Sequence, residues 1–348
     1  MKSKRNSTLE FFRVLLMLMV ITLHYFYTGG VLDKIEQSSS NYILTWVIEA
    51  ACLVSVNCYV MLSAWFLSER GATWKKAANI FAQVFFYSIT IYAVLCLSGY
   101  QSFNVMTFLT RYLFPISSGY DWFATVYIVY ILLTPFLNKI GDVIDRKEFR
   151  CLLLILFVAF SGVPTLLFFS IDNLGVNGGY SLLWFMFLHL LIMYIRKYDV
   201  RIERWKCAVV YLSATIIPLF VKLAQKLVMG TEYWDFYRYN SATTVIGALA
   251  LFMLFVQLPE RHSRFWCVLG STTFGVLLIH TQYTVRTEIL WNIIVRPLDY
   301  INGPIGSFIA HLIVSVFGIF LVCSLIDLGR QYFFQFIKWL YKRVRINA

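Results

Sequence analysis

The chain has 348 residues, of which 59% are hydrophobic and only 14% are charged. Soluble domains carry about 25% charged residues, so this composition excludes an ordinary soluble domain and indicates a protein with several membrane-spanning helices. The formal net charge is +12, but the basic residues are spread over many short segments and do not form one face with interleaved aromatic rings, which argues against a nucleic-acid partner. Anionic lipid headgroups explain this charge better.

Ten stretches are apolar and long enough to predict helices that cross a bilayer, which takes roughly 20 residues each. They cover residues 9–28, 44–67, 77–98, 120–140, 151–171, 180–196, 206–228, 241–258, 266–290 and 304–327. Little chain remains between them, and no linker or fixed-period repeat is visible. We therefore expect an all-α, polytopic membrane protein with about ten transmembrane helices, in which residues 1–348 form one membrane domain without a fused soluble domain.

Lysine and arginine predict the orientation, because short loops rich in these residues stay on the cytoplasmic side. If the N-terminus is cytoplasmic, most of the 30 lysines and arginines fall in inner segments, and the outer segments hold few. The sequence thus predicts a multi-pass protein of the cytoplasmic membrane with both termini in the cytoplasm.

The first predicted span keeps three ionisable side chains, Glu10, Arg13 and His24. Charged groups at bilayer depth cost roughly 2.5–3.5 kcal/mol each, so by default they mark a functional site. At ~100° per residue, Arg13 and His24 share one face of a helix and lie about 16 Å apart along its axis, so we expect both to face one cavity. Glu10 precedes Arg13 by three residues, a spacing that favours an ion pair. The alternative is that Glu10 and Arg13 snorkel to the inner headgroups.

The pattern Arg13-x10-His24, with an acidic residue three positions before the arginine, resembles the first-span signature of the acyltransferase 3 family of integral membrane acyltransferases. The resemblance covers nearly the whole chain. Four later segments resemble spans of the family in the same order: NCYVMLSAWFL (57–67), WFATVYIVYILLTPFLNKI (122–140), GGYSLLWFMFLHLLIMYIR (178–196) and FGVLLIHTQ (274–282). One departure concerns an Arg-x-x-Arg cluster that many members carry between spans two and three, where this chain has only Lys75 and Lys76.

The resemblance implies transfer of an acyl group, commonly acetyl from acetyl-CoA, to a hydroxyl of a surface polysaccharide or its lipid-linked precursor. A hydroxyl needs a base to remove its proton, and histidine, with a pKa near ~6.5, is the usual one. We therefore expect His24 to be the catalytic base and Arg13, oriented by Glu10, to hold a phosphate or the thioester carbonyl. Acyl-CoA is expected to dock near Arg13, Lys75 and Lys76. No metal is expected, because no His, Cys and Asp cluster has metal-ligand spacing.

Five polar or aromatic residues in later spans are candidates for the acceptor side. His280 lies in the outer half of its span, where it could orient the acceptor, support His24 or make a plain interhelical hydrogen bond. Asn57 lies mid-span, where a hydrogen bond between helices is favoured over contact with substrate. Glu49, Trp122 and Arg286 lie near outer ends of spans, where they could line the mouth of an acceptor groove, against a purely interfacial role.

Two other classes of protein are compatible with these features. A transporter or flippase of lipid-linked glycans would also place polar groups at mid-depth, although the broken, matching segments typical of such proteins are not evident. A membrane-embedded glycan polymerase is a third possibility, but the longest predicted loop, about residues 99–119, is modest in length. Hydrolysis of acyl-CoA, or labelling by it, would separate the enzyme from both.

Overall fold

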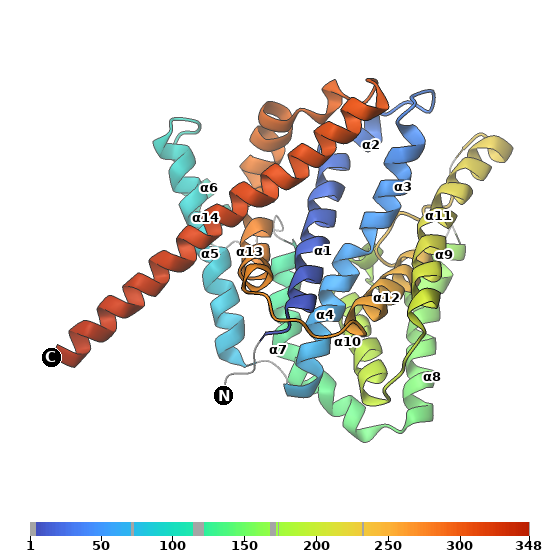
Figure 1. Cartoon of the computed structure of the whole chain (residues 1–348), viewed down its shortest axis with the longest axis horizontal. Coiled ribbons are helices and arrows are strands. Elements are labelled where there is room, and N and C mark those ends of the chain that lie inside the picture. The colour runs from blue at the N-terminus through green and yellow to red at the C-terminus, as the bar shows by residue number, and fades with distance from the viewer. Residues whose placement is uncertain are drawn as a thin grey trace.

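The computed structural model describes residues 5–70, 73–113, 122–167, 172, 174–231 and 233–347. Within these residues the chain is helical and contains no strand. The predicted all-α class is therefore confirmed. Most of the long helices lie side by side as a bundle, and the longest, α14 (Ile305–Asn347), crosses it obliquely (Figure 1).

The main helices are α1 (Ser7–Phe26), α3 (Tyr42–Leu53), α4 (Ser55–Arg70), α5 (Trp74–Leu97), α7 (Trp122–Val143), α8 (Arg146–Phe157), α10 (Leu182–Lys197), α11 (Arg204–Met229), α12 (Ala242–Val256), α13 (Arg264–His280) and α14 (Ile305–Asn347). The short elements are α2 (Val31–Lys34), α6 (Val105–Thr107), η1 (Phe108–Leu113), η2 (Val158–Gly162), α9 (Val163–Leu166), η3 (Asn177–Gly179), η4 (Val285–Val295) and η5 (Pro297–Asp299).

Within the described residues, each of the ten predicted spans coincides with a helix or with consecutive helices. Residues 120–121 and 168–171 of two predicted spans lie outside the described residues. By length and composition, seven helical segments of the described chain are candidates to cross a membrane, which confirms a polytopic membrane protein. The helices α10, α12 and α13 have 16, 15 and 17 residues. At 1.5 Å per residue they reach only about 22–26 Å. The number of ten spans and the cytoplasmic side of the termini thus stay predictions.

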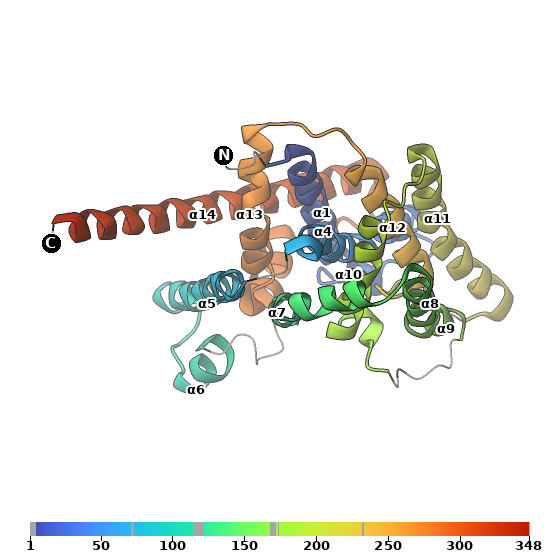
Figure 2. The same cartoon turned by 90° about the horizontal axis from the view of Figure 1, so that it is seen from below.

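Two predicted spans differ from the observed helices. The segment 266–290 is interrupted after His280, because the side chain of Gln282 accepts a hydrogen bond from the Val285 backbone N–H at 2.9 Å and starts the separate π-helix η4. The segment 304–327 continues as α14 to Asn347. No glycine or proline follows Gly329, so nothing in the sequence breaks this helix. Its C-terminal part projects beyond the other helices (Figures 1 and 2).

The helix α1 lies in the interior of the bundle, with α3, α4, α13 and α14 beside it (Figures 1 and 2). Fully buried side chains occur around its whole circumference: Phe12, Leu16, Ile21, Tyr25 and Phe26. Following the predicted orientation, we call the end of the bundle that holds Ser7 the inner end, and the end that holds Phe26 the outer end. A helix buried on all sides holds its few polar groups in fixed positions.

Candidate active site

A cavity of about 1160 Å³ runs along α1 from the inner end toward the outer end. Arg5, Arg13 and Lys76 line its inner part. His24 and Arg286 line its outer part. Arg13 and His24 therefore face the same cavity, as their spacing predicts, and the interior of the bundle connects them.

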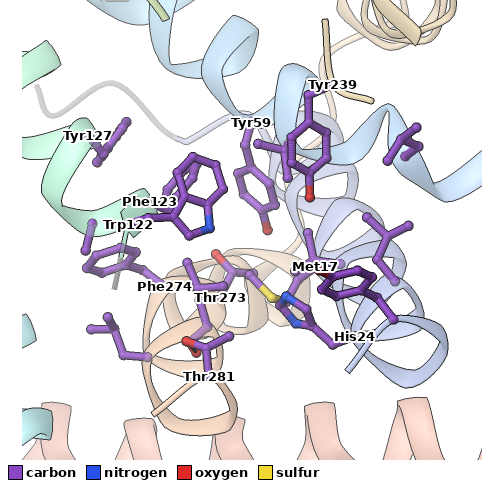
Figure 3. A pocket seen from close by; sticks show the side chains of 18 of the residues that line it. Met17, His24, Tyr59, Trp122, Phe123, Tyr127, Tyr239, Thr273, Phe274 and Thr281 are labelled. Atoms are coloured by element: carbon purple, nitrogen blue, oxygen red, sulfur yellow. Dashed lines mark hydrogen bonds between the residues drawn. The ribbon is translucent and has the colours of Figure 1, made fainter. Parts of the chain in front are cut away.

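The middle of the cavity is lined by apolar side chains with a few hydroxyl groups between them. In Figure 3, Met17 and His24 point into it from α1, Tyr59 points into it from α4, and Thr273 and Phe274 point into it from α13. Such a passage suits an extended, mostly uncharged chain better than a free ion.

Glu10 sits between two arginines at the inner end. Its side chain, 8% exposed, contacts the Arg5 guanidinium at 2.7 Å through Oε1 and the Arg13 guanidinium at 3.2 Å through Oε2. The Tyr59 hydroxyl donates to the backbone carbonyl of Arg13 at 2.6 Å. A carboxylate held by two cations is satisfied, and it fixes the Arg13 side chain, which is 26% exposed and lines the cavity. The predicted pair of Glu10 and Arg13 is thus present, while Arg5 was missed because it precedes the predicted span.

Close packing of α1 on α13 supports this cluster. A Cβ atom added to Gly270 would lie 2.2 Å from Oε2 of Glu10 and 3.0 Å from its Cβ. Only glycine leaves room there for the carboxylate, which therefore lies directly against the backbone of α13.

His24 and His280 are hydrogen-bonded at the outer end, with 2.9 Å between Nδ1 of His24 and Nε2 of His280. Nδ1 of His280 lies 2.6 Å from the backbone carbonyl of Val276. A carbonyl only accepts, so Nδ1 of His280 carries a proton, and Nε2 of the neutral ring must then accept. Nδ1–H of His24 is the donor, which leaves Nε2 of a neutral His24 with a free lone pair. His24 thus has the tautomer that a base acting through Nε2 requires.

His280 itself is 1% exposed and does not line the cavity. Of the roles open from the sequence, the geometry matches support of His24 and does not place His280 against an acceptor. The outer end of α1 has a second anchor, because the Tyr25 hydroxyl is 2.8 Å from Nδ1 of His311, whose ring stacks on Tyr300 at 3.8 Å.

Asn57 is completely buried and does not line the cavity. Its amide donates to the Tyr239 backbone carbonyl at 2.7 Å and accepts from the Trp184 indole N–H at 2.9 Å. The candidate role of Asn57 in substrate binding is therefore not matched by its position, because both halves of its amide are used between helices. Asn57 instead anchors the segment that carries Tyr239, whose side chain points into the cavity (Figure 3).

Three outer candidates, Glu49, Trp122 and Arg286, do line the cavity. The Trp122 ring lies 4.5 Å from that of Tyr180 and points into the cavity (Figure 3). At the inner end only one of the two predicted lysines is in place, because Lys76 lines the cavity while Lys75 is exposed outside it. The two side chains point about 100° apart on the helix, and here only that of Lys76 is directed at the cavity.

Several lining residues were not predicted from the sequence, among them Tyr59, Ser63, Tyr127 and Thr273. The hydroxyls of Ser63 and Tyr127 are 2.9 Å apart. Residues of these types are frequent in membrane helices, and nothing in their spacing distinguishes them. In the described part of the chain no group of three His, Cys, Asp or Glu side chains has the arrangement of a metal site.

Comparison with known proteins identifies one family. The model of the family described as "Acyltransferase domain" matches residues 6–328, a range that includes Arg13, His24 and His280. No curated protein and no solved structure matches the chain. Since the match covers nearly the whole length, and since the helices and the cavity agree with the resemblance noted in the first span, the chain belongs to the acyltransferase 3 family of membrane acyltransferases.

Proposed function

We propose that the protein is an O-acyltransferase of the cytoplasmic membrane that moves an acyl group, most simply acetyl, from acyl-CoA at the inner end to a hydroxyl group of a cell-envelope polysaccharide or its lipid-linked precursor at the outer end. The observation that carries this proposal is the single cavity that holds Arg13 toward one end and His24 toward the other. Such a cavity lets donor and acceptor enter from opposite sides.

The inner part of the cavity suits the anionic donor. Arg5, Arg13 and Lys76 bring three positive charges to the cavity, and Glu10 neutralises part of them. The planar fork of an arginine binds phosphate or carbonyl oxygens with two parallel hydrogen bonds, which a lysine does not. We therefore assign Arg13 to a phosphate of the donor, because the thioester carbonyl has to react at His24, about 16 Å farther along α1. We assign Lys76, rather than Lys75, to the phosphates of CoA as well.

The outer part of the cavity suits the transfer itself. Nε2 of His24 takes the proton of the acceptor hydroxyl while its oxygen attacks the thioester carbonyl carbon. The carbon–sulfur bond then breaks, and the thiolate of CoA receives the proton from His24, so one ester and one thiol replace one thioester and one alcohol. His280 accepts the hydrogen bond from Nδ1–H of His24 and stabilises the positive charge that His24 carries between the two steps.

A flippase of lipid-linked glycans would also need a passage through the bundle. Membership of an acyltransferase family gives that alternative no support. The two functions differ in their chemistry, because only the transferase consumes acyl-CoA.

The experiment is transfer in sealed membrane vesicles of known orientation. Acetyl-CoA with a radioactive acetyl group, supplied to the cytoplasmic face alone, should label envelope glycan, and a His24→Ala protein inserted at the normal level should lose labelling about 10²-fold or more. Mass spectrometry of glycan from cells with and without the gene identifies the product. Labelling from the opposite face only, or normal labelling by the His24→Ala protein, would contradict the proposal.

A further inference from the structure

Two buried polar atoms at the outer end of the cavity lack a hydrogen-bond partner within the described part of the chain. They are Oε2 of Glu49 and the indole nitrogen Nε1 of Trp46. Glu49 is 5% exposed, and both side chains line the cavity. Folded proteins leave few buried polar atoms unsatisfied, and each one calls for an explanation. Here a bound molecule that donates to a carboxylate and accepts from an indole N–H would satisfy both.

Both atoms belong to one face of α3, because Trp46 and Glu49 are three residues apart in the helix. Their depth matches that of His24. The side chains of Thr22 and Cys52 lie close to each other, so they lie at one level. Glu49 is three residues outward of Cys52 and His24 is two residues outward of Thr22, which puts both within about 2 Å of the same depth.

Among the described residues, the other carboxylates that line the cavity have no buried oxygen without a hydrogen-bond partner. Asp33 is exposed at the mouth. Asp235 forms an ion pair with Arg238 at 2.9 Å. In the part of the chain that the structure describes, Glu49 is therefore the lining carboxylate with a buried oxygen that has no hydrogen-bond partner.

Aromatic rings surround this part of the cavity. The Trp46 ring meets Tyr237 edge to face at 4.8 Å, and Trp122 and Tyr239 have rings 6.3 Å apart with an interplanar angle of 27°. All four side chains line the cavity, and Trp122 and Tyr239 point into it in Figure 3. Apolar rings beside a few fixed hydrogen-bonding atoms suit a sugar ring, whose C–H faces pack on aromatic surfaces while its hydroxyls find polar partners.

We propose that Trp46 and Glu49 form an acceptor-selecting subsite on α3 that takes a sugar ring. Glu49 accepts a hydrogen bond from a hydroxyl next to the one that is acylated, and the Trp46 indole donates to another oxygen of the same ring. The proposal rests on the proposed function and deepens it, because it names the residues that select which sugar and which hydroxyl reach His24.

The experiment measures acetyl transfer by the purified full chain in lipid nanodiscs. The probes are the methyl glycosides of glucose, galactose, mannose and rhamnose, followed by the monodeoxy analogues of the best acceptor. Glu49→Gln should lower kcat/KM for that acceptor about 5- to 10-fold, the effect of losing one hydrogen bond. One monodeoxy analogue should show the same loss with the wild-type protein, and Glu49→Gln should add nothing to it. Trp46→Phe should show a smaller loss. The matched control is Glu36→Gln, at an exposed residue that does not line the cavity, and it should change kcat/KM less than twofold.

The outcomes separate the subsite from the function. Wild-type protein that acetylates none of the glycosides would contradict the proposed acceptor class, and the subsite with it. In a second outcome, the wild-type protein transfers acetyl normally while Glu49→Gln lowers kcat/KM by the same factor for the best acceptor and for every monodeoxy analogue. That result would overturn the subsite and leave the proposed function standing. The folded Glu49→Gln protein should elute like the wild-type protein on size-exclusion chromatography. Loss of the folded peak would assign Glu49 to the folded structure and also overturn the subsite.

Discussion

The hydrogen bond between His24 and His280 leads to a quantitative prediction. As His24 takes up a proton it becomes charged, so the bond from its Nδ1–H to His280 changes from a neutral bond to a charge-assisted one. A neutral hydrogen bond contributes about 0.5–1.5 kcal/mol and one to a charged group about 1.5–3 kcal/mol. The difference of about 1–1.5 kcal/mol corresponds to about 5- to 13-fold in kcat. We expect that loss when the acceptor at position 280 is removed.

The matched substitutions are His280→Gln and His280→Leu. Glutamine can place its side-chain oxygen near the position of Nε2, whereas leucine fills a similar volume without an acceptor. We expect His280→Gln to retain at least about one third of kcat, and His280→Leu to fall about 10-fold. The KM for acetyl-CoA should change little in either, because His280 does not line the cavity. The assay is acetyl transfer by purified protein at saturating donor, with the amount of folded protein measured by size-exclusion chromatography.

A double substitution separates positioning of His24 from an independent role. Once His24 is replaced by alanine, His280→Leu should have no further effect on kcat, since residues that act as a unit are not additive. Equal activity of the glutamine and leucine proteins would refute the reasoning, and so would a further loss in the double variant.

The remaining predictions concern the inner end. Arg13→Lys should lower the rate of acyl transfer at least about 10-fold without affecting membrane insertion, because lysine lacks the planar fork of arginine. A normal rate would indicate that Arg13 only snorkels to the headgroups. Glu10→Gln should lower the rate of transfer in vesicles by a smaller factor. The double variant Glu10→Gln/Arg13→Lys should lose less activity than the product of the two single losses, as expected for residues in contact. Gly270→Ala should raise the KM for acetyl-CoA by displacing Glu10, whereas Gly318→Ala, where an added Cβ meets nothing within 4 Å, should leave it unchanged. Equal effects of the two alanines would contradict the packing argument.

Much of this protein was predictable from local properties of the sequence. Long apolar stretches predict helices, because in a bilayer every backbone polar group must be satisfied within its own segment. The shared face of Arg13 and His24 follows from the helical period alone, and so does the ion pair of Glu10 with Arg13. These statements need no knowledge of neighbouring helices.

Tertiary structure decided which helices meet and what each polar group contacts. His280 is 256 residues from His24, and the amide of Asn57 is hydrogen-bonded to Trp184 and Tyr239. Glu49 lines the cavity, and its Oε2 has no hydrogen-bond partner among the described residues. Residues that face lipid and residues that face another helix are both apolar, so sequence periodicity indicates poorly which side of a helix points inward. The rotation of each helix is set by its packing against the others, and that packing determined which polar groups reach the cavity.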